Sequence, residues 1–553
     1  MAGLAARPGV AEPDRGWLLA GLYPLVAAMV ALFIAYPLVE ILVRAAFVGE
    51  RLSFAPIAKV LAEPYNRQAI YNTLSLGLTV AVAGTVLATL YAYAMTRVDV
   101  PGKRCWHFLA LLPTISPPIL MALSLILLYG RRGLVTHELL GLQTTFLYGY
   151  WGLVAAQVLS YFPFAYLLLL NLFRGLDASL EEAAGTMGAH PGKVLTTVSL
   201  PLLVPGLASA CVLLFGYSFA DLGNPLLLGG DFPVLSSQIY LAIIGQFDMS
   251  KGAALAVLLL LPAAFLFFLQ KRLASRTAHA SVGGRASVRH PQVSHPAARV
   301  AALVVCGGTA LVIVMQYATV LAAAITRLFG IDNALTLRHF ETALTSSRGA
   351  LVDTIGLGVA AATAAAVLGV LIAYYVARTR AFGRDALDFI ASLPLAIPGT
   401  VIGLGFALAF NHRPLLLTGT AFIIVAAFAA RALPYSVRSG VASLQQLHRS
   451  LDEASTNLGA THEQTLWRVL LPLLRPAVVA GMIFTFTRSV TTLSAVIFVV
   501  SPHWSLVTPT ILSQMDRGDL GEAAALSVIV VALVLIVIHG VPRLFARDWR
   551  ERA

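Results

Sequence analysis

Residues 182–201 read EAAGTMGAHPGKVLTTVSLP, and residues 453–472 read EASTNLGATHEQTLWRVLLP. Both stretches begin with a Glu-Ala pair, have a Gly six residues after the Glu, and end with a Leu-Pro pair. The spacing from the Glu to the final Pro is 19 residues in each. A motif that recurs with one spacing indicates that the chain contains the same structural unit twice.

Each stretch has the pattern of two short helices joined by a tight turn. Asp177 precedes the first stretch and Asp452 precedes the second. We expect either aspartate to cap a short helix that has a glutamate in its first turn, where the helix dipole favours negative charge. Gly188 and Gly459 lie where a helix can end with a positive φ angle. The sequence therefore predicts a rigid helix–turn–helix under a membrane, ahead of each Leu-Pro.

The repetition extends over most of the chain, because two constant offsets relate its halves. The pairs at an offset of 281 residues are Asn72-Thr73 with Asp353-Thr354, Arg97 with Arg378, Gly102 with Gly383, Pro113 with Pro394, and Pro117 with Pro398. The pairs at an offset of 271 residues are Pro163 with Pro434, Gly188 with Gly459, Pro201 with Pro472, and Pro205 with Pro476. One ten-residue deletion in an outer loop of the second half accounts for the change. The halves are therefore predicted to be parallel repeats, related by an axis along the membrane normal.

The composition indicates that lipid is the solvent of this chain. Its 553 residues are 58% hydrophobic and 12% charged, and the mean hydropathy is +0.82. Soluble proteins are about a quarter charged. Apolar runs of about 20 residues or more predict twelve transmembrane helices in two six-helix halves. The first run, Trp17–Val39, is too long for the apolar core of a cleaved signal peptide, and we expect it to span the membrane.

Segments that carry Lys and Arg alternate with the apolar runs. The positive-inside rule places most of these segments, and both termini, in the cytoplasm. Residues 271–299 have six basic residues and no acidic residue, which is typical of a flexible linker. The predicted organisation is an N-terminal tail, first helix and outer loop (1–68), a first permease-like domain (69–270), the basic cytoplasmic linker (271–299), a seventh helix and outer loop (300–349), a second such domain (350–542), and a cytoplasmic tail (543–553).

The paired stretches resemble the EAA loops of permease subunits in binding-protein-dependent ABC importers. Ser455 departs from the alanine that is usual in this family. The resemblance implies an all-α membrane protein with the type I ABC importer transmembrane fold, in which these loops dock onto two copies of an ABC ATPase subunit. It also implies a periplasmic solute-binding protein as a partner, surrounding membrane lipid, and a location in the bacterial inner membrane. The residues that it assigns to ATPase coupling are Glu182, Ala183, Gly188, Glu453, Ala454 and Gly459.

The chain lacks the motifs of an ATP-hydrolysing or metal-dependent enzyme. No Lys is followed by Ser or Thr, which excludes a Walker A loop. We therefore expect no catalytic residue, cofactor or metal here, and ATP on a separate subunit. Cys105, Cys211 and Cys306 lie far apart in apolar surroundings, which argues against disulfides and a zinc site. The net charge of +12 lies in short segments between apolar runs, which favours membrane topology over nucleic-acid binding.

Two charges at predicted membrane depth are candidates for function, because such charges are costly. Asp221 and Arg488 lie on the fifth helix of the first and second half, respectively. At the 271-residue offset Asp221 aligns with Thr492, so the two charges lie about one turn apart on symmetry-related helices. One hypothesis is that they meet as a gate near the central axis; a structural ion pair, or a charge near the outer surface, is the alternative. The residues predicted to line the path beside them are Asn224, Thr491, Thr492 and Ser494.

The tenth helix carries two further charges near Pro434. We expect Arg431 and Arg438 to extend along the helix toward lipid headgroups, as long basic side chains do near membrane surfaces. A docking role at the cytoplasmic end of the helix is the alternative.

Two stretches around the candidate gate narrow the family further. Residues 219–230, FADLGNPLLLGG, and residues 488–498, RSVTTLSAVIF, resemble the fused permeases of ferric-iron importers. The resemblance implies alternating access that translocates a small solute, with ferric iron as the favoured cargo. Thiamine or 2-aminoethylphosphonate is the alternative cargo. A secondary transporter without an ATPase is the alternative mechanism, although it needs no docking loops.

Overall fold

The computed structural model describes residues 17–48, 51–280, 293 and 295–550. Within these ranges, eleven helices are long and apolar enough to cross a membrane, and the number is twelve when the pair Arg384–Leu395 and Gly399–Ala409, which is bent by 113°, is counted as one span. This confirms the predicted all-α membrane protein with about twelve spanning helices. Residues 1–16 and 49–50 of the predicted N-terminal region (1–68), 281–292 and 294 of the predicted linker, and 551–553 of the predicted tail (543–553) lie outside the described residues.

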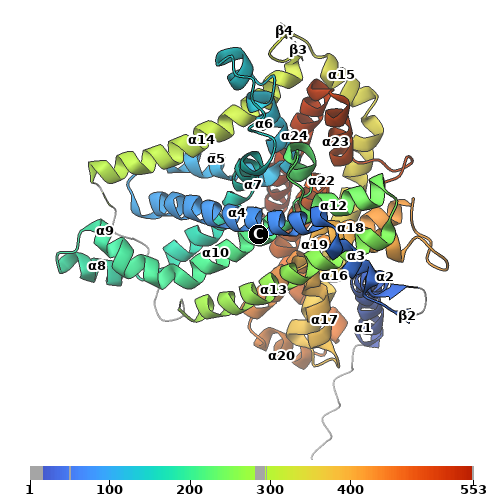
Figure 1. The fold of residues 1–553 in the computed structure, drawn as a ribbon. Coiled ribbons are helices and arrows are strands. Elements are labelled where there is room, and N and C mark those ends of the chain that lie inside the picture. The colour runs from blue at the N-terminus through green and yellow to red at the C-terminus, as the bar shows by residue number, and fades with distance from the viewer. Residues whose placement is uncertain (1–16, 49–50, 281–292, 294, 551–553) are drawn as a thin grey trace, which may run out of the picture.

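The first half contains six spans and the short elements between them (Figure 1). Its elements are α1 (Trp17–Val30), η1 (Ala31–Ala35), α2 (Tyr36–Ala46), β1 (Phe47–Val48), β2 (Arg51–Leu52), α3 (Ala55–Ala62), α4 (Pro64–Arg97), α5 (Lys103–Ile115), α6 (Pro118–Tyr129), η2 (Leu134–Leu139), α7 (Tyr150–Gly175), α8 (Ala178–Thr186), α9 (Pro191–Val194), η3 (Leu195–Ser199), α10 (Leu200–Ala220), α11 (Gly223–Leu228), α12 (Leu235–Tyr240), η4 (Leu241–Gly245) and α13 (Met249–Ala280).

The second half repeats this order with a shorter outer loop before its fourth span. Its elements are α14 (Pro296–Ile325), β3 (Thr326–Leu328), β4 (Asp332–Leu335), α15 (Arg338–Thr345), α16 (Arg348–Arg378), α17 (Arg384–Ser392), η5 (Leu393–Leu395), α18 (Gly399–Ala409), α19 (Ala421–Gln446), α20 (Ser450–Asn457), α21 (His462–Thr465), η6 (Leu466–Leu470), α22 (Leu471–Thr491), α23 (Val507–Arg517) and α24 (Leu520–Arg550). The strands form two small antiparallel hairpins, β1–β2 and β3–β4.

The packing of the helices follows the repeat. In the first half, α4, α7 and α10 pack against one another, and in the second half α16, α19 and α22 do the same. The third span of each half is broken at an equivalent proline. Pro117 has φ −58° and ψ 137°, and Pro398 has φ −55° and ψ 143°. Proline disfavours helical conformation in the residue before it, and Ser116, which precedes Pro117, is extended with φ −101° and ψ 152°. The chain therefore leaves the helix between α5 and α6, and Pro398 lies at the equivalent position before α18.

The first span of each half packs largely on the other half. Helices α1 and α2 contact α16, α17 and α18, while α14 contacts α4, α5 and α6 (Figure 1). Two tyrosines fix these crossings: Tyr375 donates to the carbonyl of Leu19 at 2.7 Å, and Tyr317 donates to the carbonyl of Leu112 at 2.9 Å. The halves are therefore interlocked, although each is built as a unit of its own.

The predicted linker is partly helical. Residues 271–280 continue α13, and α14 begins at Pro296. Between them, Val293 forms a short parallel bridge with Val98, at the end of α4. Arg299 forms an ion pair with Asp99 in the same region. The described ends of the linker thus pack on the loop that follows α4.

Candidate coupling site and central cavity

Helix α8 contains the first Glu-Ala pair and begins with a capped turn. The Asp177 carboxylate accepts a hydrogen bond from the backbone N–H of Ser179 at 2.9 Å, as the sequence predicted. This bond lowers the pKa of Asp177 below its ordinary value. After the helix, Gly188 has φ 86°, and the equivalent Gly459 after α20 has φ 84°. This left-handed conformation favours glycine and turns the chain toward the next span.

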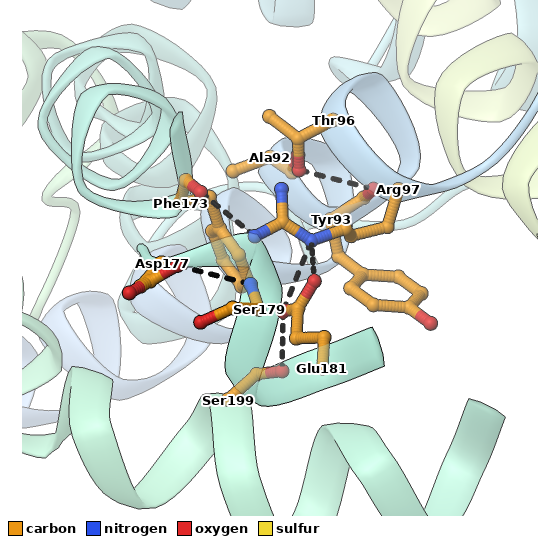
Figure 2. Close-up of polar contacts among 9 residues, drawn as sticks. All are labelled: Ala92, Tyr93, Thr96, Arg97, Phe173, Asp177, Ser179, Glu181 and Ser199. Atoms are coloured by element: carbon orange, nitrogen blue, oxygen red, sulfur yellow. Dashed lines mark hydrogen bonds and ion pairs between the residues drawn. The ribbon is translucent and has the colours of Figure 1, made fainter. Parts of the chain in front are cut away.

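Arg97, the last residue of α4, ties α8 to the spanning helices (Figure 2). Its Nε lies 2.7 Å from Oε2 of Glu181, and its Nη2 donates to the carbonyl of Phe173 at 2.9 Å. The Glu181 carboxylate also accepts from Ser199 Oγ at 2.8 Å, ahead of α10. The arginine and glutamate side chains are 3% and 5% exposed. One buried ion pair therefore joins α4, α7, α8 and the start of α10.

The second half repeats this anchor at the equivalent residues. Arg378 Nε lies 3.3 Å from Oδ2 of Asp452, and its Nη2 donates to the carbonyls of Leu444 and Leu447, each at 2.9 Å. Asp452 was expected as a cap, and that expectation is wrong because α20 begins at Ser450 after Arg449, which leaves Asp452 inside the first turn. Burial raises the pKa of Asp452, and Arg378 opposes this rise.

The six residues assigned to coupling are solvent-exposed and lie on or directly after α8 and α20. Two large apolar side chains at equivalent positions are exposed with them: Met187 is 83% exposed and Leu458 is 89% exposed. Sequence reasoning missed these two, although each directly precedes the turn glycine. We call this set the docking face, and its members are Glu182, Ala183, Met187, Gly188, Glu453, Ala454, Leu458 and Gly459.

A cavity of about 860 Å³ lies between the two halves. Helices α10, α13, α17, α19 and α22 line it. Lys271 and Asp385 line its end nearest the docking face, and Arg488 and Thr492 line its deep end. A narrower cavity of about 50 Å³ continues past Arg488 to Asp221, Thr491 and Ser494. The predicted path residues are thus brought together, apart from Asn224, which lines neither cavity but donates a hydrogen bond to Asp221.

Asp221 is held by amides rather than by a cation. Its Oδ2 accepts hydrogen bonds from Gln157 Nε2 at 2.9 Å and Asn224 Nδ2 at 2.7 Å, and its side chain is buried. Gln157 in turn accepts from Ser218 Oγ at 2.6 Å. Across the described part of the chain, no ion pair joins Asp221 to Arg488, although both line the narrow cavity. The gate function of this pair stays a prediction.

Replacing Asp221 with Asn is expected to weaken this network, because the new amide group faces donors where the carboxylate accepted. A hydrogen bond to a charged group contributes about 1.5–3 kcal/mol. We therefore expect a lower melting temperature in detergent and slower transport by the assembled importer. Asp231→Asn is the control, since Asp231 is exposed near the same end. Wild-type transport by both Asp221→Asn and Arg488→Gln would contradict the gate.

Arg431 and Arg438 lie on the cavity wall, so the expectation that they extend to lipid headgroups is wrong. Together with Tyr435 they have the spacing i, i+4 and i+7, which puts them on one face of α19. Arg438 forms an ion pair with Asp388 at 3.2 Å and donates to Ser392 Oγ at 2.7 Å. Arg431 lines both the wide and the narrow cavity. The helical spacing was a usable signal for this face.

Comparison with known proteins supports the repeat and the resemblance. Residues 81–279 and 365–551 each match the family described as "Binding-protein-dependent transport system inner membrane component". The ferric transport system permease protein FbpB of Actinobacillus pleuropneumoniae is 32% identical over 520 residues, which cover 92% of this chain and 76% of that protein. A putative ferric transport system permease protein of Haemophilus influenzae is 32% identical over 86% of this chain and 76% of that protein.

A third relative matches part of the chain. The putative 2-aminoethylphosphonate transport system permease protein PhnV of Salmonella paratyphi A is 28% identical over 39% of this chain and 82% of that protein. The family match occurs twice and covers most of the chain, at positions that contain the docking face and its two arginine anchors. The chain is therefore a two-half member of the family of binding-protein-dependent transport system inner membrane components.

Proposed function

We propose that this chain is the permease subunit of an ABC importer that carries ferric iron across the bacterial inner membrane. The observation that supports it best is the docking face, where two equivalent short helices are exposed and each is tied by an arginine to the spanning helices. Two copies of a separate ATPase subunit, which binds ATP, would dock there. A solute-binding protein would deliver the cargo at the opposite end.

The anchors suggest how ATP hydrolysis moves the halves. A displacement of α8 acts on α4 and α7 through Arg97, and a displacement of α20 acts on α16 and α19 through Arg378. These helices form the packed unit of each half. The central cavity lies between the units, so their relative motion opens it alternately to the two sides of the membrane. The chain itself acts as a transport subunit.

The basic segments give the proposed orientation. The docking face and the ends of α13 and α24 lie in or beside segments rich in Lys and Arg, which the positive-inside rule assigns to the cytoplasm. Both termini then lie in the cytoplasm, and the hairpins β1–β2 and β3–β4 face the periplasm. In this orientation the wide cavity has its mouth toward the cytoplasm.

The cargo assignment follows the relatives that match almost the whole chain. Both ferric transport permeases are 32% identical to it. A second candidate is 2-aminoethylphosphonate, because the PhnV relative covers 39% of this chain and because arginines line the cavity. A secondary transporter is not favoured, since it has no use for two anchored docking helices.

Uptake into proteoliposomes tests the cargo. The purified importer, with ATP inside and the iron-loaded binding protein outside, is expected to accumulate ⁵⁵Fe. The same vesicles are tested separately with a phosphonate-loaded binding protein and labelled 2-aminoethylphosphonate. An ATPase-dead partner subunit is the control and is expected to abolish accumulation. Uptake of 2-aminoethylphosphonate, with no uptake of iron, would instead identify the phosphonate as the cargo. Accumulation of solute without any ATPase subunit would contradict the importer.

A further inference from the structure

We propose that the central cavity binds its cargo as an oxygen-rich anion, through the guanidinium groups of Arg431 and Arg488. This rests on the proposed importer function and specifies the cargo's chemical form. Arg431 lies on α19 and Arg488 on α22, and both line the wide and the narrow cavity. Two cations thus lie where the two cavities meet.

Neither guanidinium has an acidic partner among the residues that the structure describes. The ion pairs found there contain neither Arg431 nor Arg488. Arg488 lies over the ring of Phe164, with its guanidinium carbon 5.8 Å from the ring centre. A cation at this depth of a membrane protein is costly and generally marks a substrate or ion path.

The acidic side chains on the cavity walls are engaged elsewhere. Asp221 accepts hydrogen bonds from Gln157 and Asn224. Asp388 pairs with Arg438 at 3.2 Å, and Asp385 lies 3.5 Å from Arg384. None of these carboxylates forms an ion pair with Arg431 or Arg488 in the described residues, so the charge of the two deep arginines is left for a ligand.

The first half has no cation at the positions that correspond to these arginines. At the 271-residue offset Arg431 corresponds to Ser160, and Arg488 corresponds to Tyr217. The first half builds the same packed unit of three helices without a cation at either position. The positive charge of the two arginines therefore lies only on the side of the cavity that the second half forms. A role in binding explains this asymmetry better than a role in packing, which the repeat would place in both halves.

Guanidinium groups recognise a particular kind of ligand. They donate paired hydrogen bonds to carboxylate and phosphate oxygens, and rings of Arg or Lys select anions in membrane pores. A bare ferric ion would be repelled by both charges. A free oxyanion such as a phosphonate, or a ferric ion enclosed by enough carboxylate or phosphate oxygens to be negative overall, fits the site.

Equilibrium binding to the purified full-length chain tests this inference. The probes are inorganic phosphate and ferric citrate, each measured with wild type, Arg431→Gln and Arg488→Gln. We expect wild type to bind at least one probe, and each substitution to weaken binding about tenfold or more, as for a lost charge-assisted hydrogen bond. Arg488→Lys keeps the charge and is expected to retain part of the affinity.

Arg131→Gln is the matched control. Arg131 lies over the ring of Tyr148 at 5.7 Å, much as Arg488 lies over Phe164, but it is outside both cavities. We expect its affinity to equal that of wild type. Melting temperatures show which variants remain folded, and only folded variants are compared.

The outcomes separate the two sources of the anion. Arginine-dependent binding of phosphate alone supports a free oxyanion as cargo, and arginine-dependent binding of ferric citrate alone supports a chelated ferric ion. No binding to wild type, or equal binding to wild type and both glutamine variants, overturns the inference. A permease that still assembles with its ATPase in that case keeps the importer function, whereas loss of that assembly would contradict the importer itself.

Discussion

Arg97→Gln is expected to destabilise the protein by about 3–5 kcal/mol, as when one partner of a buried ion pair is removed. The remaining Glu181 carboxylate would be 5% exposed and would keep only Ser199 as a donor. The α7 carbonyl of Phe173 would also lose its donor. We expect a lower melting temperature, and an ATPase whose hydrolysis no longer responds to the loaded binding protein.

The second half supplies the control for this prediction. Arg378→Gln removes the equivalent pair, but Asp452 is 30% exposed and can be solvated by water. Its destabilisation is therefore expected to be clearly smaller. The double variant Arg97→Gln/Glu181→Gln leaves no unpaired charge and is expected to recover part of the lost stability while it stays uncoupled. An equal loss of stability in Arg97→Gln and Arg378→Gln would contradict the claim that burial of the remaining carboxylate determines the size of the effect.

Gly188→Asp is expected to abolish substrate-dependent ATP hydrolysis and to leave the protein folded in the membrane. A Cβ at Gly188 meets no atom within 4 Å, so the first side-chain atom has open space around it. The left-handed backbone at φ 86° adds a strain of about 1–2 kcal/mol. The large effect comes from a charged group placed on the docking face. Gly459→Asp is expected to behave in the same way.

The control is a glycine with the same backbone at the other end of the molecule. Gly419 has φ 85°, and a Cβ at this position would also meet no atom within 4 Å. Gly419→Asp therefore carries the same strain without touching the docking face. We expect it to retain the ATPase during purification, while Gly188→Asp loses it. A Gly188→Asp variant with normal, substrate-dependent ATP turnover would contradict the role of α8.

Much of the fold could be predicted because the information is local or repeated. Long apolar runs indicate spanning helices, and the aligned Gly and Pro positions identify the two halves. Pro117 and Pro398 illustrate this, since equal residues at equivalent places give nearly equal backbone angles. The capped start of α8 at Asp177 is likewise a local pattern. The interlocking of α1 and α14 with the opposite halves depends on long-range packing and was not predicted.

The site was predicted less completely, for a similar reason. The Glu-Ala pairs and glycines of the docking face form a contiguous motif. Arg97 is 84 positions from Glu181, and nothing local indicates that pairing. The offset that relates Arg97 to Arg378 indicated that both arginines belong to the repeat. It did not indicate which carboxylate pairs with either of them. Whether Arg431 contacts lipid or the cavity depends on which way its face of α19 is turned. That orientation is set by how α19 packs on its neighbours, which the local sequence does not show.

Purification from membranes in mild detergent, followed by an ATPase assay, tests the central claim most directly. The chain is expected to retain a separate ATPase subunit, with two copies per permease, and hydrolysis is expected to rise when the cargo-loaded binding protein is added. The Gly188→Asp variant should lose this response in the same assay. A permease that purifies without an ATPase, and transports solute in its absence, would contradict the account.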